Sequence, residues 1–419
     1  MIDPHPPTPW TVIDLFSGAG GMSYGFHSHS RFKLVGAADA EIGKPSTGFG
    51  ALDCNGTYEA NIGIKPVAVD LGEVDPDDLF QRFAPGLRDG RVDVLSACPP
   101  CTGFSRTNHE NHLRDDPRNS LVARTALFVR RFRPRVLVME NARELIMGKF
   151  LHHIEALTEA LDELGYEVST ATHFLTAFGL PQFRERAVVV AVERPLVLRT
   201  LEDLWEGHEV KDGALTVRRA IGHLRPLVAG EACSDDPNHT CTHSDGLQLR
   251  RLIATPEDGG SWIDWARHPD ADELLIPSMK RSIEAGTTNH FCDVYGRMAW
   301  DKPAPTIKRE CSHIGNGRYA HPSQHRLCSV REMAILQGFP ARFRFLGKSR
   351  KNLYRAIGDA VPPLVSYQLA HVAEWTLTGE RPALRDVVLP DTHLRADDIV
   401  IKRAPARPVP VPTPQLSLF

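Results

Sequence analysis

Six short apolar runs, separated by segments with helical periodicity, organise the first 192 residues and constrain the fold most strongly. Each run is bounded by Gly, Pro, Asp or a charged segment, as buried strands usually are. The runs are Thr11–Leu15, Leu34–Ala38, Pro66–Val69, Val92–Ala97, Val136–Met139 and Ala187–Val192. Helical patterns cover Leu121–Phe132 and Phe150–Leu164. Strands that alternate with helices build βαβ units, so the sequence predicts an α/β fold with a parallel sheet that is covered on both faces.

The regular alternation ends near Glu193, and this change predicts a division into lobes. Gly, Pro, Asp and His interrupt short runs until about Cys328, so we expect a first lobe at 1–192 and a smaller, irregular lobe at 193–328. Helical patterns return at Val330–Gln337 and Val361–Trp375, which predicts that 329–380 completes the first lobe. An extension at 381–402 and a Pro-rich, disordered tail at 403–419 follow.

The charge of the chain is unevenly distributed. The net charge is −3, yet residues 278–356 carry 15 Lys and Arg against 5 acids, and residues 103–135 carry 8 Arg against 3 acids. Two basic stretches in an acidic remainder suit a protein that neutralises phosphates on one face, although a solvated charged surface is the alternative. Eight irregularly spaced cysteines indicate reduced thiols. No apolar run is long enough for a signal peptide or a membrane span, so we expect a cytosolic protein.

A Gly-rich turn follows the first predicted strand. Gly18, Gly20 and Gly21 have no side chain to keep a ligand from the backbone. The turn lacks the ending of a phosphate-binding loop, so a nucleoside cofactor without a pyrophosphate fits better than a nucleotide, and a purely structural turn is the alternative. Asp39 ends the second predicted strand, where an acid can accept from ribose hydroxyls, and Asp70 ends the third, where it could accept from an adenine amino group.

Two cysteines follow the fourth predicted strand, at the edge where open α/β sheets bind ligands. Cys98 and Cys101 could form a redox pair, Cys101 could be a nucleophile held by two preceding prolines, or both could share a zinc site. The redox interpretation lacks the thioredoxin-like surroundings that it needs. The zinc interpretation needs irregularly spaced partners, namely Cys233, His239, Cys241 and His243.

A carboxyl and a row of polar residues lie at neighbouring strand ends. Glu140 ends the fifth predicted strand, and Gln182, Arg184 and Arg186 alternate on entry to the sixth, so their side chains point to one side. Each alone is consistent with a solvated position. Together with a thiol, they form a site that can add a nucleophile to an electron-poor ring.

The order of these blocks resembles a known family. DLFSGAGG, PPCTGFS, ENA, QFRER, VREMAILQGFP and IGDAVPP follow one another between Thr11 and about Trp375, as in the C5-cytosine DNA methyltransferases. The resemblance implies a Rossmann-like, S-adenosylmethionine-dependent methyltransferase core with a mixed, mostly parallel sheet, and a smaller, irregular target-recognition domain at 193–328. The sequence departs from the usual pattern at Thr102, Ala142 and Asp359, and an insertion follows the second strand at Gly43–Gly56.

The resemblance also implies roles for individual residues. Cys101 would add to C6 of a flipped-out cytosine, Glu140 would hold N3 and the exocyclic amine, and Arg186, supported by Arg184, would contact O2. Covalent attack is chemically reasonable, because a thiolate at C6 turns the ring into an enamine that can take a methyl group at C5. The cofactor would contact Phe16, Gly18, Gly20, Gly21, Asp39, Asp70 and Pro100. Double-stranded DNA would contact Ser105, Arg106, Gln182, Arg309 and Arg318. No metal site is expected.

Two other functions share this fold. An RNA cytosine methyltransferase acting on transfer RNA would have a smaller recognition region than the one here, and a silent DNA-binding protein would lack the nucleophile or the glutamate. The family setting suggests restriction–modification or phage defence, a monomer, and a cognate restriction endonuclease as partner. Gln415, Leu416, Leu418 and Phe419, behind the Pro-rich spacer, resemble the peptide by which bacterial proteins dock in the sliding clamp, although an apolar terminus that folds back is the alternative.

Overall fold

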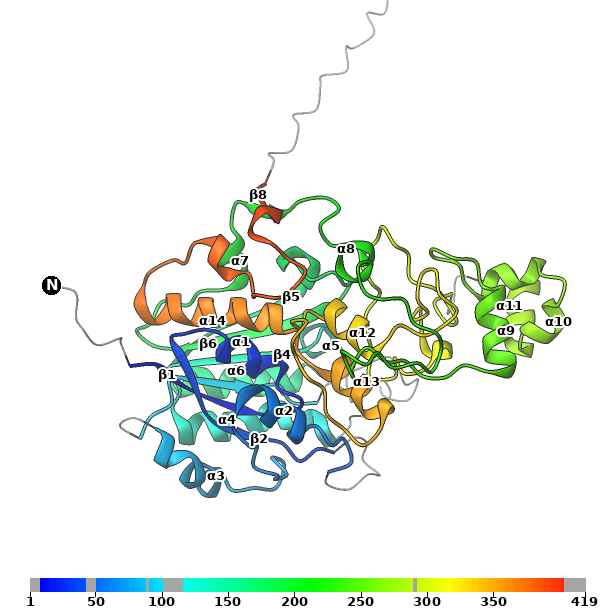
Figure 1. The fold of residues 1–419 in the computed structure, drawn as a ribbon. Helices are drawn as coiled ribbons and strands as arrows, with labels where there is room; N and C mark the ends of the chain where they lie inside the picture. The colour runs from blue at the N-terminus through cyan, green and yellow to red at the C-terminus, as the bar shows by residue number, and fades with distance from the viewer. Residues whose placement is uncertain are drawn as a thin grey trace, which may run out of the picture.

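The computed structural model describes residues 8–42, 50–87, 90–100, 115, 117–288 and 292–402. Its centre is a six-stranded sheet with the strand order β2-β1-β3-β4-β6-β5 (Figure 1). Neighbours among the first four strands run parallel, whereas β6 runs antiparallel to β4 and to β5. The strands are β1 Trp10–Leu15, β2 Phe32–Ala38, β3 Val94–Ala97, β4 Val136–Ala142, β5 Tyr166–Phe174 and β6 Glu185–Glu193. The predicted mixed, mostly parallel sheet is confirmed.

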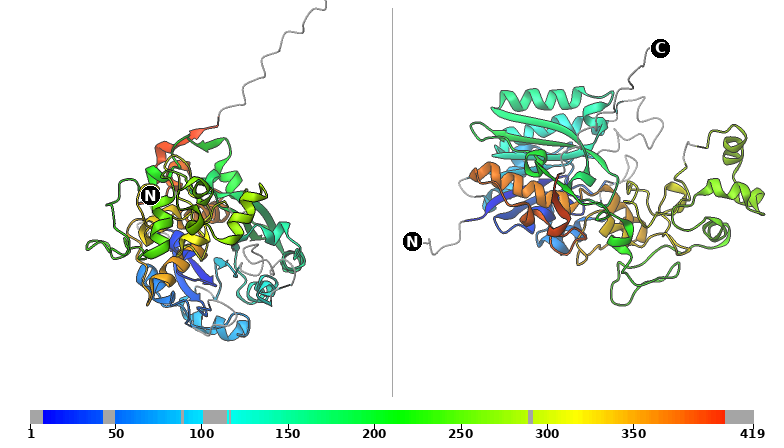
Figure 2. Two further views of the ribbon diagram at one scale, coloured as in Figure 1. Left: turned by 90° about the vertical axis from the view of Figure 1, so that its right-hand side faces the viewer. Right: turned by 90° about the horizontal axis from the view of Figure 1, so that it is seen from above.

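Helices cover both faces of this sheet, as predicted. Alternate strand residues point to opposite faces, so Val12 and Val138 join one core while Ile13 and Leu137 join the other. The first core is closed by α1 and α14, and the second by α3, α4 and α6 (Figures 1 and 2). The bounds of these helices are α1 Gly21–His27, α3 Pro76–Phe83, α4 Ser120–Phe132, α6 His152–Glu163 and α14 Pro363–Thr378.

The structure departs from two strand predictions. Pro66–Val69 is not a strand, because only the bridge between Ala38 and Val67 connects it to the sheet, and a proline offers no N–H to a ladder. Conversely, β5 was not predicted. It is an edge strand with mostly half-exposed residues, so it lacks the apolar run that marks a buried strand.

The return segment has three helices, of which two were predicted. α12 Val330–Leu336 and α14 fall within the predicted patterns, whereas α13 Arg350–Asp359 has a basic first turn and was missed. The remaining helices of the described residues are α2 Asn55–Ile62, α5 Glu144–Met147, α7 Leu201–Trp205, α8 Val217–Ile221, α9 Gly246–Ala254, α10 Ala271–Leu274 and α11 Pro277–Glu284. α14 packs against α1, so the return segment and the first helix of the chain cover the same face of the sheet.

The second lobe is irregular, and buried arginines hold it together. Its only strand among the described residues is the three-residue β7 His208–Val210, so many of its backbone carbonyls need other donors. The guanidinium of Arg297 is fully buried and donates to the carbonyls of Leu252, Thr255, His321 and Gln324. Trp262 and Trp265 form a small separate core beneath α9–α11, which project away from the sheet (Figure 1). Part of the positive charge predicted for DNA binding is therefore structural.

The extension at 381–402 packs onto the beginning of the second lobe. β8 Ile399–Ile401 pairs antiparallel with β7 His208–Val210. The carboxylate of Asp398 is buried between Lys211 and Arg219, at 3.0 and 2.6 Å from their nitrogens. Among the described residues, no helix has both the length and the apolar character that crossing a membrane requires.

The close approach of α1 to α14 makes Gly25 a sensitive position. A Cβ at Gly25 would lie 2.2 Å from the backbone nitrogen of Tyr367, so the two helices would have to separate. We expect Gly25→Ala to lower the free energy of unfolding by about 2–3 kcal/mol, measured by urea denaturation. Gly56→Ala is the matched control. Its Cβ would meet nothing within 4 Å, and alanine favours the helix, so this change should be neutral or stabilising by about 0.5 kcal/mol.

Candidate active site

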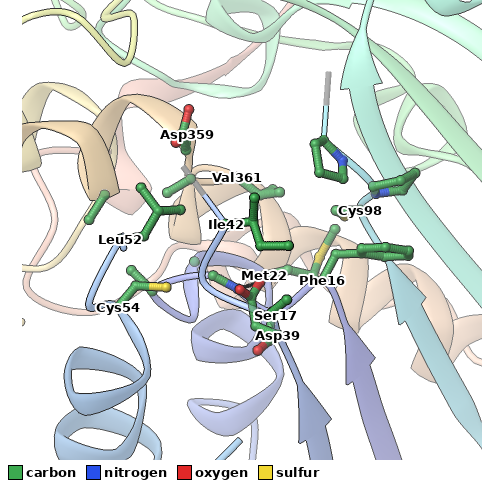
Figure 3. A pocket seen from close by; sticks show the side chains of 18 of the residues that line it. Phe16, Ser17, Met22, Asp39, Ile42, Leu52, Cys54, Cys98, Asp359 and Val361 are labelled. Atoms are coloured by element: carbon green, nitrogen blue, oxygen red, sulfur yellow. Dashed lines mark hydrogen bonds between the residues drawn. The ribbon is translucent and has the colours of Figure 1, made fainter. Parts of the chain in front are cut away.

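A cavity of about 430 Å³ opens at the carboxyl edge of the sheet, where the predicted site residues were expected (Figure 3). Phe16 follows β1, Asp39 follows β2, Cys98 follows β3, and Glu140 lies near the end of β4. Parallel strands end at one edge, so each contributes the residue that follows it. Of the residues predicted to contact the cofactor, those that line the cavity are Phe16, Gly18, Gly21, Asp39, Asp70 and Pro100.

The Gly-rich turn shapes the floor of the cavity. Phe16 has a φ of 59° and Gly18 a φ of 50°, so the chain reverses sharply between β1 and α1. A Cβ on Gly18 would meet nothing within 4 Å, which leaves its backbone open to a ligand. Gly20 does not line the cavity, because it faces the ring of Tyr58. At Gly21 a Cβ would lie 2.2 Å from the carbonyl oxygen of Val361, so this glycine allows the return segment to close the site.

Asp39 and Asp70, two of the carboxyls at the cavity, accept hydrogen bonds from backbone N–H groups of the neighbouring loops. Asp39 accepts hydrogen bonds from the backbone N–H of Gly18 at 2.8 Å and of Glu41 at 2.6 Å. Burial raises the pKa of Asp39, and these two hydrogen bonds oppose the rise. Asp70 accepts from the N–H of Gly72 at 2.8 Å. Each carboxylate oxygen has a second lone pair, so both acids can still accept from hydroxyl or amino groups of a ligand.

Sequence reasoning missed the apolar wall of the cavity. Ile42, Leu52 and Cys54 come from the segment after β2, and Val361 comes from the return segment (Figure 3). Leu52 and Cys54 belong to the insertion at 43–56, whose described part therefore has a place at the cavity; residues 43–49 lie outside the described residues. An isolated apolar residue in a loop gives no periodic signal, so its partner surface could not be predicted.

Glu140 and Arg186 form an ion pair across β4 and β6. The Nε atom of Arg186 lies 3.0 Å from Oε1 of Glu140, and Glu140 is only 8% exposed. Arg184 lies further away, with Nε at 3.9 Å from the same oxygen. Its guanidinium donates to the carbonyls of Ile307, Gly358 and Ala360, so Arg184 joins the sheet to the return segment. A carboxylate aligned by a half-buried arginine can present hydrogen-bonding oxygens to a planar ring.

The loop after β3 is attached to β4 by Asn141. Its side-chain amide donates to the carbonyl of Pro99 at 3.0 Å, and its oxygen accepts from the N–H of Ala142. Cys98 accepts a hydrogen bond from the N–H of Glu140 at 3.3 Å. Burial raises the pKa of the Cys98 thiol well above its usual range, so this sulfur stays protonated. Cys101 lies outside the described residues, whereas Pro100 beside it lines the cavity together with Glu140.

Two residues predicted to contact DNA have protein partners instead. Gln182 is fully buried: its amide donates to Gln337 and accepts from the N–H of Ile307, so a DNA contact is not supported. The alternation that placed it beside Arg184 holds, but both residues face the return segment. Arg318 pairs with Asp293 and donates to the carbonyls of Gly259, Gly260 and Arg297, which also favours a structural role.

The other predicted DNA contacts are placed differently or not described. Arg309 lines the cavity and pairs with Asp359, 2.6 Å away, so the departure from the family pattern at position 359 supplies a partner for this arginine. Ser105 and Arg106 lie outside the described residues, as do Thr102 and the four tail residues Gln415, Leu416, Leu418 and Phe419.

The zinc interpretation of Cys98 does not agree with the structure. Both ring nitrogens of His239 have protein partners, the hydroxyl of Ser329 and the carbonyl of Arg225. Cys241 is buried near the carbonyl of Val228. Within the described part of the chain, these residues do not gather with Cys98 around a common point. Their spacing was irregular because each has a separate packing role.

Comparison with known proteins identifies the family. Residues 10–375 match the family model described as C-5 cytosine-specific DNA methylase. The chain is 30% identical over 382 residues to the Type II methylase M.HgiDII of Herpetosiphon aurantiacus, which covers 90% of this chain and 99% of that protein. It is also 30% identical over 372 residues to the Type II methyltransferase M1.HphI of Haemophilus parahaemolyticus, covering 88% of each chain.

A solved structure supports the same fold. The S. pombe Dnmt2 methyltransferase superposes with a TM-score of 0.56 at 18% identity, covering 88% of this chain and 99% of that one. The core is thus the Rossmann-like fold of S-adenosylmethionine-dependent methyltransferases. From the match over residues 10–375, we conclude that this protein belongs to the C-5 cytosine-specific DNA methylase family and is a DNA cytosine-5 methyltransferase.

Proposed function

We propose that this enzyme methylates C5 of a flipped-out cytosine in a specific double-stranded DNA sequence through a covalent bond between Cys101 and C6. The observation that carries the proposal is that Glu140 lines the cavity together with Pro100 and is paired with Arg186, whose Nε atom lies 3.0 Å from its carboxylate. Cys101, the proposed nucleophile, directly follows Pro100 in the sequence and would therefore come next to a residue that lines this cavity. A pyrimidine that enters from the DNA side would meet a carboxylate and a cation on its polar edge.

The cavity fits S-adenosylmethionine, which the family uses as cofactor. Its lining combines apolar side chains with Asp39 and Asp70, and the open backbone at Gly18 lets a ligand approach closely. Asp39 would hold the ribose hydroxyls, Asp70 the adenine amino group, and Phe16, Leu52 and the apolar wall would enclose the adenine. When bound, the cofactor supplies an electrophilic methyl group on a sulfonium.

The protein residues would activate the base. The thiolate of Cys101 adds to C6, and the electron pair moves to C5, which becomes nucleophilic. Glu140 would hold a proton at N3 and accept from the exocyclic amine, so that negative charge on the ring is offset. Arg186 would keep Glu140 in place and reach O2. After methylation, loss of the C5 proton and expulsion of the Cys101 thiolate restore the aromatic ring.

Trapping on a modified base tests this reaction. In 5-fluorocytosine, C5 carries fluorine instead of the proton that must leave, so the proposed adduct should persist once the methyl group has been added. We expect a denaturation-resistant complex with duplex DNA, cofactor and the wild-type enzyme, located by peptide mass spectrometry at Cys101. A cross-link at Cys98, or methylation without any adduct, would contradict the mechanism. The same assay on transfer RNA distinguishes DNA from RNA as substrate.

Asn141 should act as a positioning residue for the nucleophile loop. Its amide holds the carbonyl of Pro99, two residues before Cys101. We expect Asn141→Ala to lower kcat about 100-fold, because displacement of a reacting atom by about 1 Å has an effect of this size. The cofactor Kd, measured by calorimetry, should stay within about threefold of the wild-type value. A parallel loss of cofactor binding would show instead that the whole edge of the sheet had collapsed.

The biological setting follows from the substrate. We place the enzyme on the chromosome in the cytoplasm, as a monomer, in restriction–modification or phage defence. Its relatives named as Type II methyltransferases support this setting, which includes a cognate restriction endonuclease. Bisulfite sequencing of DNA from cells that express the chain would reveal the recognised sequence. Methylation scattered over all cytosines would contradict a sequence-specific role.

The chain terminus would dock this enzyme on the bacterial sliding clamp. Gln415, Leu416, Leu418 and Phe419 form an apolar anchor after a Pro-rich spacer, and such an anchor gains free energy by entering a hydrophobic pocket. We expect a peptide of residues 408–419 to bind purified clamp, measured by fluorescence anisotropy. A peptide with Leu418→Ala and Phe419→Ala should bind at least about tenfold more weakly. Equal binding by both peptides would refute the docking.

A further inference from the structure

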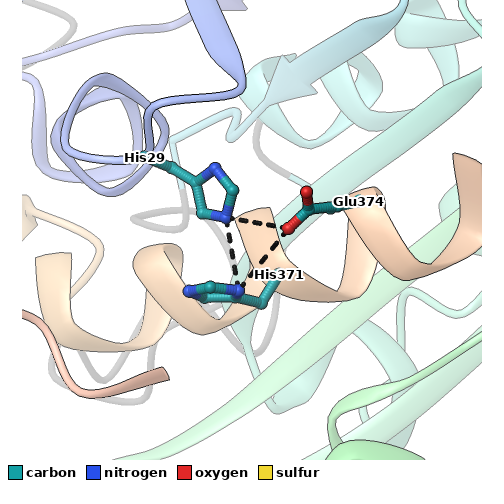
Figure 4. Close-up of side chains that lie close together, drawn as sticks. All are labelled: His29, His371 and Glu374. Carbon is teal, nitrogen blue, oxygen red and sulfur yellow. Dashed lines mark hydrogen bonds and ion pairs between the residues drawn. The ribbon is translucent and has the colours of Figure 1, made fainter. Parts of the chain in front are cut away.

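A second cluster of chemically reactive side chains lies outside the active site. His29 follows α1, on the turn to β2, while His371 and Glu374 lie one turn apart on α14 (Figure 4). The cavity residues Gly18 and Gly21 lie at the other end of α1, so this cluster is separate from the active site. His29 and His371 are 5% and 6% exposed, and the structure brings them together over 342 residues of sequence.

The three heteroatoms face a common point. Nε2 of His29 lies 3.2 Å from Nδ1 of His371 and 3.2 Å from Oε2 of Glu374, and the last two atoms are 3.8 Å apart. The centre of a circle through the three atoms is about 2.0 Å from each. This matches the bond lengths of about 2.0–2.2 Å that zinc makes to histidine nitrogen and carboxylate oxygen. Hydrogen bonds among the three side chains would not require their three heteroatoms to lie equally far from one point.

The remaining atoms of the three side chains are held in different ways. Nε2 of His371 is buried and makes no hydrogen bond within the described part of the chain, so this ring is positioned by its contacts with the rings of His29 and Tyr367 instead of by a carbonyl acceptor. The other oxygen of Glu374 lies 3.7 Å from Arg31, which leaves Oε2 for a ligand. The His29 ring is fixed by edge contacts with Phe32 and His371, at centroid distances of 5.2 and 4.3 Å.

We propose that His29, His371 and Glu374 bind one divalent transition-metal ion, with Zn²⁺ as the best match. Two imidazoles and one carboxylate are a common zinc set, and Glu374 is 24% exposed, so water can supply a fourth ligand. The ion would join the end of α1 to α14, the two helices that close one face of the sheet. It therefore has a structural function, and it does not take part in methyl transfer.

Metal binding requires one change in the cluster. The N–H of Arg31 donates to Nδ1 of His29 at 3.3 Å, which places the ring proton on Nε2 in the metal-free chain. The ion binds the other tautomer, so the proton moves to Nδ1 and this long hydrogen bond is lost. In this tautomer Nδ1 of His371 accepts the hydrogen bond from His29, so its lone pair already points toward the proposed position of the ion.

Metal titration of the full-length protein tests the site. After treatment with chelator and dialysis, we expect the wild-type protein to bind one equivalent of Co²⁺ with visible d–d absorption and without a thiolate charge-transfer band. Added Zn²⁺ should displace the Co²⁺ and raise the thermal midpoint by about 3–5 °C. The absent charge-transfer band excludes the eight cysteines as ligands.

Matched variants separate a metal site from a hydrogen-bond network. Glu374→Gln preserves size and hydrogen bonding but removes the anionic ligand, so Zn²⁺ affinity should fall at least about 100-fold. His27→Ala changes an exposed histidine at the end of α1, two residues before His29, and this variant should bind like the wild type. Wild-type protein that binds no more Co²⁺ than Glu374→Gln would overturn the proposal. A thermal midpoint that Zn²⁺ leaves unchanged in the wild type would overturn it as well, even if Glu374→Gln unfolds at a lower temperature.

Discussion

Cys101→Ala is expected to lower the rate of methyl transfer by about 10⁴-fold or more, while DNA and cofactor binding remain within about tenfold of wild type. The reason is chemical. Without a nucleophile at C6, C5 of cytosine has too little electron density to attack a methyl group. Burial raises the pKa of Cys54 and Cys98, the described thiols that line the cavity, so neither can replace Cys101. Single-turnover transfer of radiolabelled methyl groups to duplex DNA measures the effect.

The neighbouring thiol provides the control for this experiment. Cys98 lies three residues earlier in the same loop, but it accepts a hydrogen bond from the N–H of Glu140 and its raised pKa keeps it neutral. Cys98→Ala should keep the transfer rate within about tenfold of wild type. If Cys98→Ala were inactive and Cys101→Ala active, the two sulfurs would have exchanged roles and the proposed reaction would be wrong.

Glu332→Leu is expected to lower the free energy of unfolding by about 3–5 kcal/mol, because it leaves a buried arginine without its partner. Arg326 donates two hydrogen bonds of 2.7 Å to the Glu332 carboxylate, and both side chains are 1% exposed. Glu332 also accepts from the N–H of Ser329, which caps α12. Urea denaturation measures the change, and a loss below about 1 kcal/mol would contradict it.

Acid should reduce the stabilisation that the Arg326–Glu332 ion pair provides. Burial alone raises the pKa of Glu332, but the hydrogen bonds from Arg326 outweigh it and set the pKa at about 2, below its usual 4.5. Because its pKa is lowered in the fold, the ionised Glu332 carboxylate stabilises the protein fully above pH 4.5. This contribution to the free energy of unfolding is lost as the pH falls toward 2. The double variant Arg326→Met, Glu332→Leu removes both charges, so it should be more stable than Glu332→Leu and should lack this acid-dependent loss.

The order of strands and helices could be predicted because it depends on local patterns. Apolar runs of four to six residues marked the buried strands, and the periodic segments marked α4, α6, α12 and α14. The edge strand β5 was missed because it lacks an apolar run, and the helix α13 was missed because its sequence is polar overall, although one of its faces is buried. Pro66–Val69 was wrongly predicted to be a strand because its local sequence is apolar enough, although it pairs with the sheet through a single bridge.

The position of the cavity could be predicted from a single rule of sheet topology, but the residues that form its apolar wall could not. Residues that follow parallel strands meet at one edge, so Phe16, Asp39 and Glu140 could be brought together from the sequence. The apolar wall formed by Leu52 and Val361 depends on which distant loops pack there. Gln182 shows the opposite error, since its polar side chain looked suited to DNA but satisfies buried groups of the return segment.

The sequence alone therefore determined the buried strands of the sheet, the edge at which the site lies, and the acid and arginine that meet there, because these follow from periodicity and chain direction. The tertiary structure decided which polar residues face a ligand and which face the protein, as Arg184 and Arg318 illustrate. It also decided the meeting of His29 with His371. Contacts between segments hundreds of residues apart depend on the packing of whole helices, and no local pattern encodes them.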